Sequence, residues 1–280
     1  MASSTNKKKD QRREARNRLR IEREAQARRA RLRGRLLVGG SLVAVLGIAA
    51  AAGVYASNSA ASSGSSAPAG SADPDAAGKP FVQPANTTGK DGVVIPYGKA
   101  DAQHTLTVWL DPRCPYCAGV EIGLGRTIKE QADAGEYKVE YRFATFLDSA
   151  LGGGKGSKRA VNALGAAANE GPEKFMEYLQ VLYRNHPEKE TDDKYGSTAT
   201  LLELAAQVPG LRTPAFDGAV KDLTYMPWTE KVGKAFHDEG VKGTPAVFID
   251  GKQITVNTGR GIDSVTPEVF GKLIAENRKG

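Results

Sequence analysis

Cysteine is scarce in this sequence, because only Cys114 and Cys117 occur among its 280 residues. A zinc site would need two further ligands beside this pair. There is no third cysteine, and the histidines are scattered along the chain at His104, His186 and His237. The scarcity argues against a zinc site and leaves the two thiols to pair with each other.

Charge is absent from the 21 positions between Leu36 and Ala56, which are rich in Leu, Val, Ala and Gly. About 20 apolar residues span the hydrocarbon core of a bilayer, so the sequence predicts one transmembrane helix over residues 36–56. The apolar run is longer than the core of a signal peptide, which favours an uncleaved signal-anchor. Small residues follow at Ala56–Ala60, so cleavage after the span is the alternative.

Lysine and arginine are absent from residues 57–78, whereas residues 1–35 carry 14 of them against four acidic residues. Because positive charge stays on the cytoplasmic side of a membrane, residues 1–35 are predicted to be a basic cytoplasmic tail. The chain after the span would then lie outside, as the extracytoplasmic part of a single-pass protein of the cell membrane. Disulfides form and persist in such a compartment.

The formal net charge of +7 comes from this tail alone. The tail contributes +10, so the rest of the chain, with 25 basic and 28 acidic residues, has a net charge of −3. The tail also contains no aromatic residue on which a nucleic-acid base could stack. These observations argue against nucleic acid as a partner and suit a tail that lies beside anionic lipid head groups.

Hydrophobic periodicity is absent from residues 57–88, which are rich in Ala, Ser, Gly and Pro. This composition is typical of a flexible linker. The remaining residues, 89–280, are numerous enough for one domain with a single core.

Several segments of this domain predict an α/β fold. His104–Leu110 is apolar on both faces, as in a central strand, and alternation near residues 137–145 predicts a half-buried strand. Helical patterns follow over about residues 147–240. Asp250-Gly251 then predicts a hairpin turn, and Thr266-Pro267 predicts the start of a closing helix.

The cysteines stand where the central strand gives way to a helix, in the run Cys114-Pro115-Tyr116-Cys117. A disulfide that closes about four residues removes little entropy from the unfolded chain, roughly 2 kcal/mol at most, so a structural staple is a weak explanation. Unpaired N–H groups and the helix dipole at a helix start stabilise a thiolate at Cys114, whereas Cys117 would lie one turn further in. The pattern indicates electron transfer through a redox-active pair.

Two motifs give the domain a specific resemblance to a known family. The run Asp111–Cys117, and the block Gly243–Gly251 about 130 residues later, resemble the DsbA-like thioredoxin-fold family. The likeness is greatest to its membrane-anchored actinobacterial thiol–disulfide oxidoreductases, and it covers about residues 90–279. It implies a thioredoxin fold with a helical insertion before the cis-proline hairpin, here preceded by one transmembrane helix.

The resemblance also implies roles for individual residues. Cys114 would be the nucleophile, Cys117 the resolving thiol and Pro245 a cis-proline beside them, while Thr244 would offer its backbone to a substrate strand. No cofactor would be needed beyond the redox-active Cys114–Cys117 disulfide. The partners would be exported cysteine-containing proteins and a membrane redox partner that reoxidises or reduces the pair.

Three neighbours of the cysteines are further candidates for the site. Pro115 suits the first helical position, where the missing N–H costs no hydrogen bond. Tyr116 either tunes the nearby sulfur or is simply the exposed residue of the turn. Arg113 either favours the thiolate or is solvated.

One position departs from the family pattern. Many thioredoxin-like proteins carry a buried acid about six residues before the first cysteine, where this chain has Val108. Asp111 lies nearer and either takes over proton transfer or caps the active-site turn. His237 falls on a predicted helix and is expected to be structural.

Three functions are compatible with these residues. The first is a dithiol oxidase that forms disulfides in extracytoplasmic proteins. The second is a reductase or isomerase of such disulfides, fed by a membrane electron donor. The third is a non-enzymatic thioredoxin-like binding module with an inert disulfide. A thiolate held at a helix terminus, in an oxidising compartment, favours the oxidase.

Overall fold

The computed structural model describes residues 73–256 and 265–278. The predicted cytoplasmic tail and transmembrane helix, residues 1–56, lie outside these residues. No helix within the described ranges is long and apolar enough to cross a membrane.

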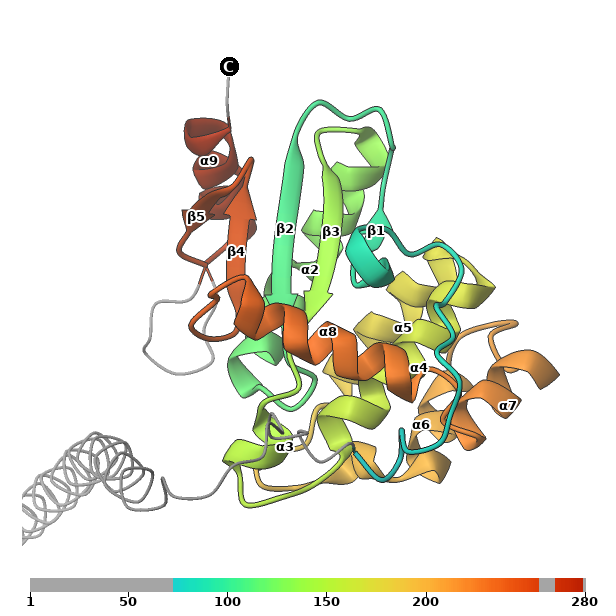
Figure 1. Ribbon diagram of the computed structural model, residues 1–280. Helices are drawn as coiled ribbons and strands as arrows, with labels where there is room; N and C mark the ends of the chain where they lie inside the picture. The colour runs from blue at the N-terminus through green and yellow to red at the C-terminus, as the bar shows by residue number, and fades with distance from the viewer. Residues whose placement is uncertain (1–72, 257–264, 279–280) are drawn as a thin grey trace, which may run out of the picture. The chain divides into compact units, whose positions relative to one another are not determined.

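A mixed five-stranded sheet forms the centre of the domain, in the strand order β1-β3-β2-β4-β5 (Figure 1). Strands β2 and β3 run parallel, and the other neighbouring pairs are antiparallel. Each edge strand is three residues long. The strands are β1 (Ile95–Tyr97), β2 (Thr105–Leu110), β3 (Lys138–Phe143), β4 (Ala246–Ile249) and β5 (Lys252–Ile254).

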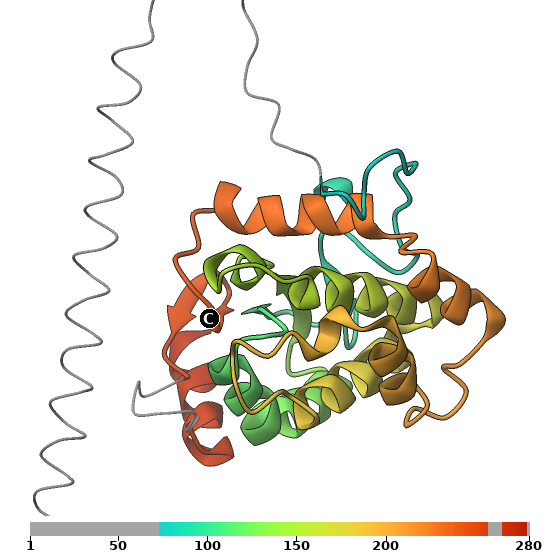
Figure 2. The same ribbon diagram turned by 90° about the horizontal axis from the view of Figure 1, so that it is seen from below.

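Strand β2 is central, as its apolar pattern predicts. Leu106, Val108 and Leu110 are fully buried on one face, where helix α2 (Pro115–Ala134) packs. Trp109 points to the other face, where it meets the ring of Phe236 edge-on from helix α8 (Met226–Asp238). Helices therefore cover the sheet on both sides (Figure 2).

A helical insertion separates β3 from β4, over nearly the predicted range of 147–240. Its helix α5 packs against α2 on the same face of the sheet. The elements before α8 in this insertion are α3 (Leu147–Ala150), α4 (Gly156–Glu170), α5 (Pro172–Arg184), η2 (Lys194–Gly196), α6 (Thr198–Ala205) and α7 (Pro214–Lys221).

The end of the domain follows the local sequence signals. Asp250 and Gly251 join β4 to β5 and both have positive φ, 50° and 82°, as a tight hairpin turn requires. The side chain of Thr266 accepts a hydrogen bond from the N–H of Val269 and so caps the last helix, α9 (Pro267–Asn277). The predicted hairpin and helix start are both confirmed.

Residues 73–88, termed the strap, differ from the prediction of a flexible linker up to residue 88. Asp73 forms an ion pair with Lys158 at 2.7 Å, and Asp75 pairs with Lys155 and Arg159 at 2.8 and 2.9 Å. The domain's contacts thus begin before the predicted boundary at residue 89. The small-residue composition hides this feature, because the basic partners of the two acids lie on and beside α4, some 80 residues later.

Candidate active site

The cysteine pair lies where β2 passes into α2 (Figure 1). Cys114 is the N-terminal cap of α2, with φ −78° and ψ 118°, and Pro115 takes the first helical position as predicted. The N–H of Cys114 donates to the carbonyl of Asp111 at 2.9 Å. The strand end and this tight turn therefore fix Cys114 at the helix terminus.

The two sulfurs differ in exposure and in partners. Both residues are free cysteines; Cys114 is 4% exposed and Cys117 is fully buried. The Sγ of Cys114 donates to the carbonyl of Thr244 at 3.4 Å, and the Sγ of Cys117 accepts from the N–H of Asp111 at 3.5 Å. The first sulfur is thus the one nearer the surface.

These surroundings separate the acidities of the two thiols. A hydrogen bond from the thiol of Cys117 lowers the pKa of Cys114, and the backbone N–H groups at the helix start add to this effect against an opposing cost of burial. Burial raises the pKa of Cys117, and hydrogen bonding to Cys114 raises it further. Cys114 is therefore the thiol of the pair that ionises more readily.

The proline loop lies beside Cys114, as the resemblance implies. The peptide bond between Thr244 and Pro245 is cis, and β4 begins at the next residue. Because the carbonyl of Thr244 accepts from Cys114, this loop and the reactive sulfur share one small region of the surface. Tyr116, which is 41% exposed, is the exposed residue of the turn.

Asp111 caps the active-site turn. Its fully buried carboxylate accepts from the N–H of Arg113 at 3.0 Å, the hydroxyl of Ser157 at 2.6 Å and the N–H of Leu147 at 3.3 Å. Burial raises the pKa of Asp111 to about 7, although these hydrogen bonds oppose the rise. Of the two predicted roles for Asp111, this geometry favours the cap.

Arg113 is buried and paired, and it is not solvated. Its side chain is 1% exposed, and its guanidinium donates to Asp148 at 3.1 Å, lies 3.4 Å from Asp193 and donates to the carbonyl of Glu190 at 3.2 Å. These partners all belong to the insertion. The side chain therefore fastens the active-site turn to the insertion, and the prediction of a solvated arginine is wrong.

Two residues around the pair, His186 and Glu121, were not predicted from the sequence. His186 stacks on the ring of Tyr183. Burial lowers the pKa of His186, although hydrogen bonding to the backbone of Arg113 opposes this change. Glu121 lies on the buried face of α2, one turn after Cys117. The helical spacing of Cys117 and the apolar residues after it could have placed Glu121 on the buried face of α2. No pattern near His186 in the sequence predicts its position. His237 lies on α8, as predicted.

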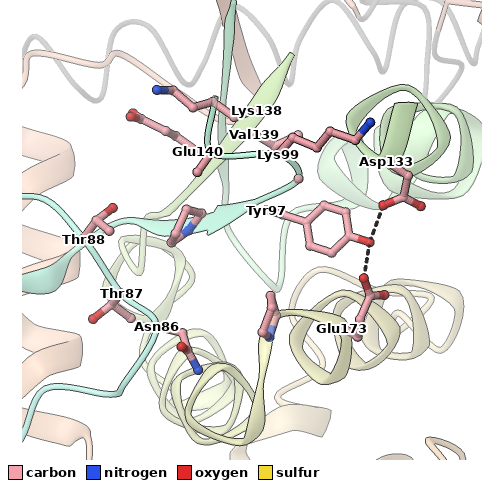
Figure 3. Close-up of a pocket in the computed structure, with 14 residues that line it drawn as sticks. Asn86, Thr87, Thr88, Tyr97, Lys99, Asp133, Lys138, Val139, Glu140 and Glu173 are labelled. Atoms are coloured by element: carbon pink, nitrogen blue, oxygen red, sulfur yellow. Dashed lines mark hydrogen bonds between the residues drawn. The ribbon is translucent and has the colours of Figure 1, made fainter. Parts of the chain in front are cut away.

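A separate pocket of about 580 Å³ opens beside β1 (Figure 3). The hydroxyl of Tyr97 lies there between the carboxylates of Asp133 and Glu173, 2.8 Å from each. Residues 138–140, at the start of β3, line it. Because β3 runs parallel to β2, this pocket is at the opposite end of the sheet from the cysteines, and none of the predicted site residues lines it.

No cluster of three or more His, Cys, Asp or Glu side chains among residues 73–256 and 265–278 could hold a metal ion.

Comparison with known proteins places this geometry in a family. A family model described as thioredoxin matches residues 90–276. Disulfide bond formation protein D of Bacillus subtilis (strain 168) is 23% identical over 158 residues, which are 56% of this chain and 68% of that protein.

Two solved structures have a similar fold. One is a reduced disulfide bond oxidoreductase (DsbG) of Mycobacterium tuberculosis, with TM-score 0.54, 22% identity and coverage of 67% of this chain and 88% of that one. The other is oxidised BdbD of Bacillus subtilis, with TM-score 0.53, 20% identity and coverage of 69% and 95%. Since the family model spans nearly the whole described domain, the chain belongs to the thioredoxin family.

Proposed function

We propose that this protein is an exported, membrane-tethered dithiol oxidase that forms disulfides in extracytoplasmic proteins. The observation that carries the proposal is the division between the two sulfurs: Cys114 lies at a helix terminus with a lowered pKa, and Cys117 is buried with a raised one. A stabilised thiolate favours the reduced form of the pair, so the disulfide gives up its oxidising equivalents readily.

The reaction transfers two electrons and two protons. A substrate thiolate attacks the Sγ of Cys114 in the oxidised pair, a mixed disulfide forms, and the sulfur–sulfur bond breaks with its electrons going to Cys117. A second substrate thiolate then attacks the substrate sulfur of the mixed disulfide and releases Cys114 as a thiolate. The substrate leaves with a disulfide, and a membrane redox partner must reoxidise the pair.

The proline loop suits a protein substrate. The backbone of Thr244 borders Cys114, so an extended substrate segment can form hydrogen bonds with it whatever its side chains are. The name of the Bacillus subtilis relative, which refers to disulfide bond formation, supports the oxidising direction. Export and tethering are supported by the apolar run at residues 36–56 and the basic residues before it.

The direction is tested by mixing the oxidised full chain with a reduced, unfolded protein that needs disulfides for activity. We expect that activity to return faster than with glutathione disulfide alone, and we expect the Cys117→Ala variant to accumulate mixed disulfides through Cys114. A pair found mostly reduced in cells, with a potential near that of thioredoxin, would instead indicate a reductase. A double cysteine variant that keeps its function in cells would indicate a binding module.

The location is tested by adding protease to intact spheroplasts. Proteolysis should remove the domain and leave an N-terminal fragment in the membrane. Protection of the domain would contradict the proposed topology, and a soluble secreted product beginning near Ser57 or Ala60 would indicate cleavage after the span.

A further inference from the structure

The strap, residues 73–88, is a folded segment that the proposed function does not use. Near its start Asp73 pairs with Lys158 at 2.7 Å, in the first turn of α4, and near its end the side chain of Asn86 donates to the carbonyl of Ala168 at 3.0 Å. The strap therefore runs along α4 in the same direction as that helix (Figure 1). It follows nearly the whole of α4, whose 15 residues are about 22 Å long.

The strap is packed into the domain as well as paired by charge. Pro84 is buried, and a Cβ at Gly165 in the middle of α4 would lie 3.1 Å from Cγ of Pro84 and 2.8 Å from the ring of Trp228. Because glycine is less favourable than alanine inside a helix, the close approach of the strap and of this ring explains the glycine. Nearer the start of the strap, Nζ of Lys231 lies 4.7 Å from the ring centroid of Phe81. The strap is thus part of the domain.

The two ends of the strap lie at opposite ends of the domain. Residues 86–88 line the pocket beside β1, at the end of the sheet away from the cysteines. The start of the strap lies against the first turn of α4, where the hydroxyl of Ser157 donates to the carboxylate of Asp111 at 2.6 Å. Asp111 caps the turn that holds Cys114. The chain before residue 73 therefore joins the domain at its active-site end.

This arrangement changes where the predicted linker is attached. A linker of residues 57–88, as the composition predicts, would join the domain beside β1, away from the cysteines. With the strap in place the linker is residues 57–72, and a flexible chain of 16 residues has a typical end-to-end length of about 20 to 24 Å. The strap thus shortens the linker and moves its attachment along the domain by about the length of α4.

We propose that the strap attaches the membrane tether beside the active site, so that Cys114 stays within reach of a redox protein embedded in the membrane. A short tether raises the effective concentration of one partner at the other, provided that the two sites can meet. The surface that meets the membrane partner would be the turn of Cys114 together with α3, and not the end beside β1. This inference rests on the proposed function, because it takes the membrane anchor from it.

The test places the full chain in vesicles of phosphatidylcholine and phosphatidylglycerol that contain an acceptor-labelled lipid. A donor dye is attached at one of two exposed positions, through Ala150→Cys on α3 or Glu136→Cys at the opposite end of the sheet. Cys114→Ser and Cys117→Ser are included so that the dye reacts at one site only. Energy transfer to the lipid should be at least about twofold greater from position 150, because the far end lies about one length of α4 further away.

A charge reversal of the strap tests whether this segment sets the attachment. Asp73→Lys with Asp75→Lys places two cations against Lys155, Lys158 and Arg159, so the start of the strap should be released.

The difference in energy transfer between the two labels should then fall by at least about half, because the linker becomes longer and more of the domain is within its reach. Asp101→Lys, an exposed acid outside the strap, is the matched control and should leave the difference as it is.

A functional measurement uses the same charge reversal with both native cysteines present. The purified full chain should exchange with glutathione disulfide at the wild-type rate, because the variant leaves the cysteine pair untouched. In cells, reoxidation of the pair after a pulse of dithiothreitol should be about threefold slower, because the effective concentration at the membrane partner falls. Reoxidation at the wild-type rate in cells would overturn the proposal.

The two labels also separate this inference from the proposed function. Equal transfer from both positions, or greater transfer from position 136, would overturn the inference and leave the oxidase function intact. An unchanged difference in the charge-reversed chain would likewise show that the strap does not set the attachment. No transfer from either position would instead overturn the membrane tethering of the proposed function.

Discussion

Asp111 and Glu121 are both buried acids beside the cysteine pair, yet their surroundings differ. Asp111 accepts three hydrogen bonds from the turn and the insertion, whereas neither carboxylate oxygen of Glu121 has a partner among the described residues. Burial raises the pKa of both, to about 7 and about 8. The two acids therefore differ in their hydrogen-bond partners and not in their burial: Asp111 holds the turn, whereas the carboxyl group of Glu121 is buried without such support.

The largest loss of stability is expected from a substitution at Arg113, in the turn that Asp111 caps. Replacing Arg113 by Met removes the cation that is paired with the buried Asp148 and leaves only backbone N–H groups to support its charge, so we expect the free energy of unfolding to fall by about 3 to 5 kcal/mol. Urea unfolding measures this loss. Because the guanidinium is already engaged by Asp148, Asp193 and the carbonyl of Glu190, the rate at which Cys114 is alkylated should change little; a large fall in that rate would mean that Arg113 does stabilise the thiolate.

Asp111→Ala should have the next largest effect. It leaves two backbone N–H groups and the hydroxyl of Ser157 buried without an acceptor, which we expect to cost about 3 kcal/mol in thermal unfolding at pH 6. The exposed Asp101→Ala is the matched control and should change stability by less than about 0.5 kcal/mol. Equal losses of stability in Asp111→Ala and Asp101→Ala would show that the hydrogen bonds accepted by Asp111 do not stabilise the fold.

Glu121→Gln should have the opposite sign. Since burial raises the pKa of Glu121 from its ordinary 4.5 to about 8, its contribution to stability is present below pH 4.5 and is lost as the pH rises through 8. The variant lacks this loss. We expect it to be more stable than the wild type by about 2 kcal/mol at pH 8.5 and similar to it at pH 4.5. A variant less stable at both values would show that the carboxylate has partners after all.

The strap gives the smallest effect. Asp75→Asn removes partly exposed ion pairs with Lys155 and Arg159, for which we expect a loss of about 0.5 kcal/mol. Limited proteolysis is the more sensitive measurement, because local release of the strap should speed cleavage between residues 73 and 88. Cleavage at the wild-type rate would show that the remaining contacts hold the strap without this acid.

Local sequence signals predicted much of the fold and part of the site. Alternation and apolar runs identified the strands, Asp250-Gly251 the hairpin and Thr266 the helix cap, because each depends on a few adjacent residues. The position of Cys114 at a helix start follows in the same way from its strand and from Pro115. The cis bond before Pro245 came from the resemblance and not from the residues themselves.

Contacts between distant parts of the chain could not be predicted from the sequence. The partners of Arg113 lie 35 and 80 residues later, and those of Asp75 lie 80 or more residues later. Glu121 was overlooked because a glutamate on a helix is normally solvated, and its burial depends on α5 packing over α2. Such long-range pairings have no local pattern from which they could be read.

The edges of the sheet bear on how this domain coexists with its proposed substrates. Unfolded chains tend to add strands to an open sheet edge, which leads to aggregation. Both edge strands here have three residues, and Pro96 in the middle of β1 has no N–H to offer an incoming strand. Exposed Lys252 adds charge at the other edge. The domain can therefore work among nascent, strand-prone chains without templating their aggregation.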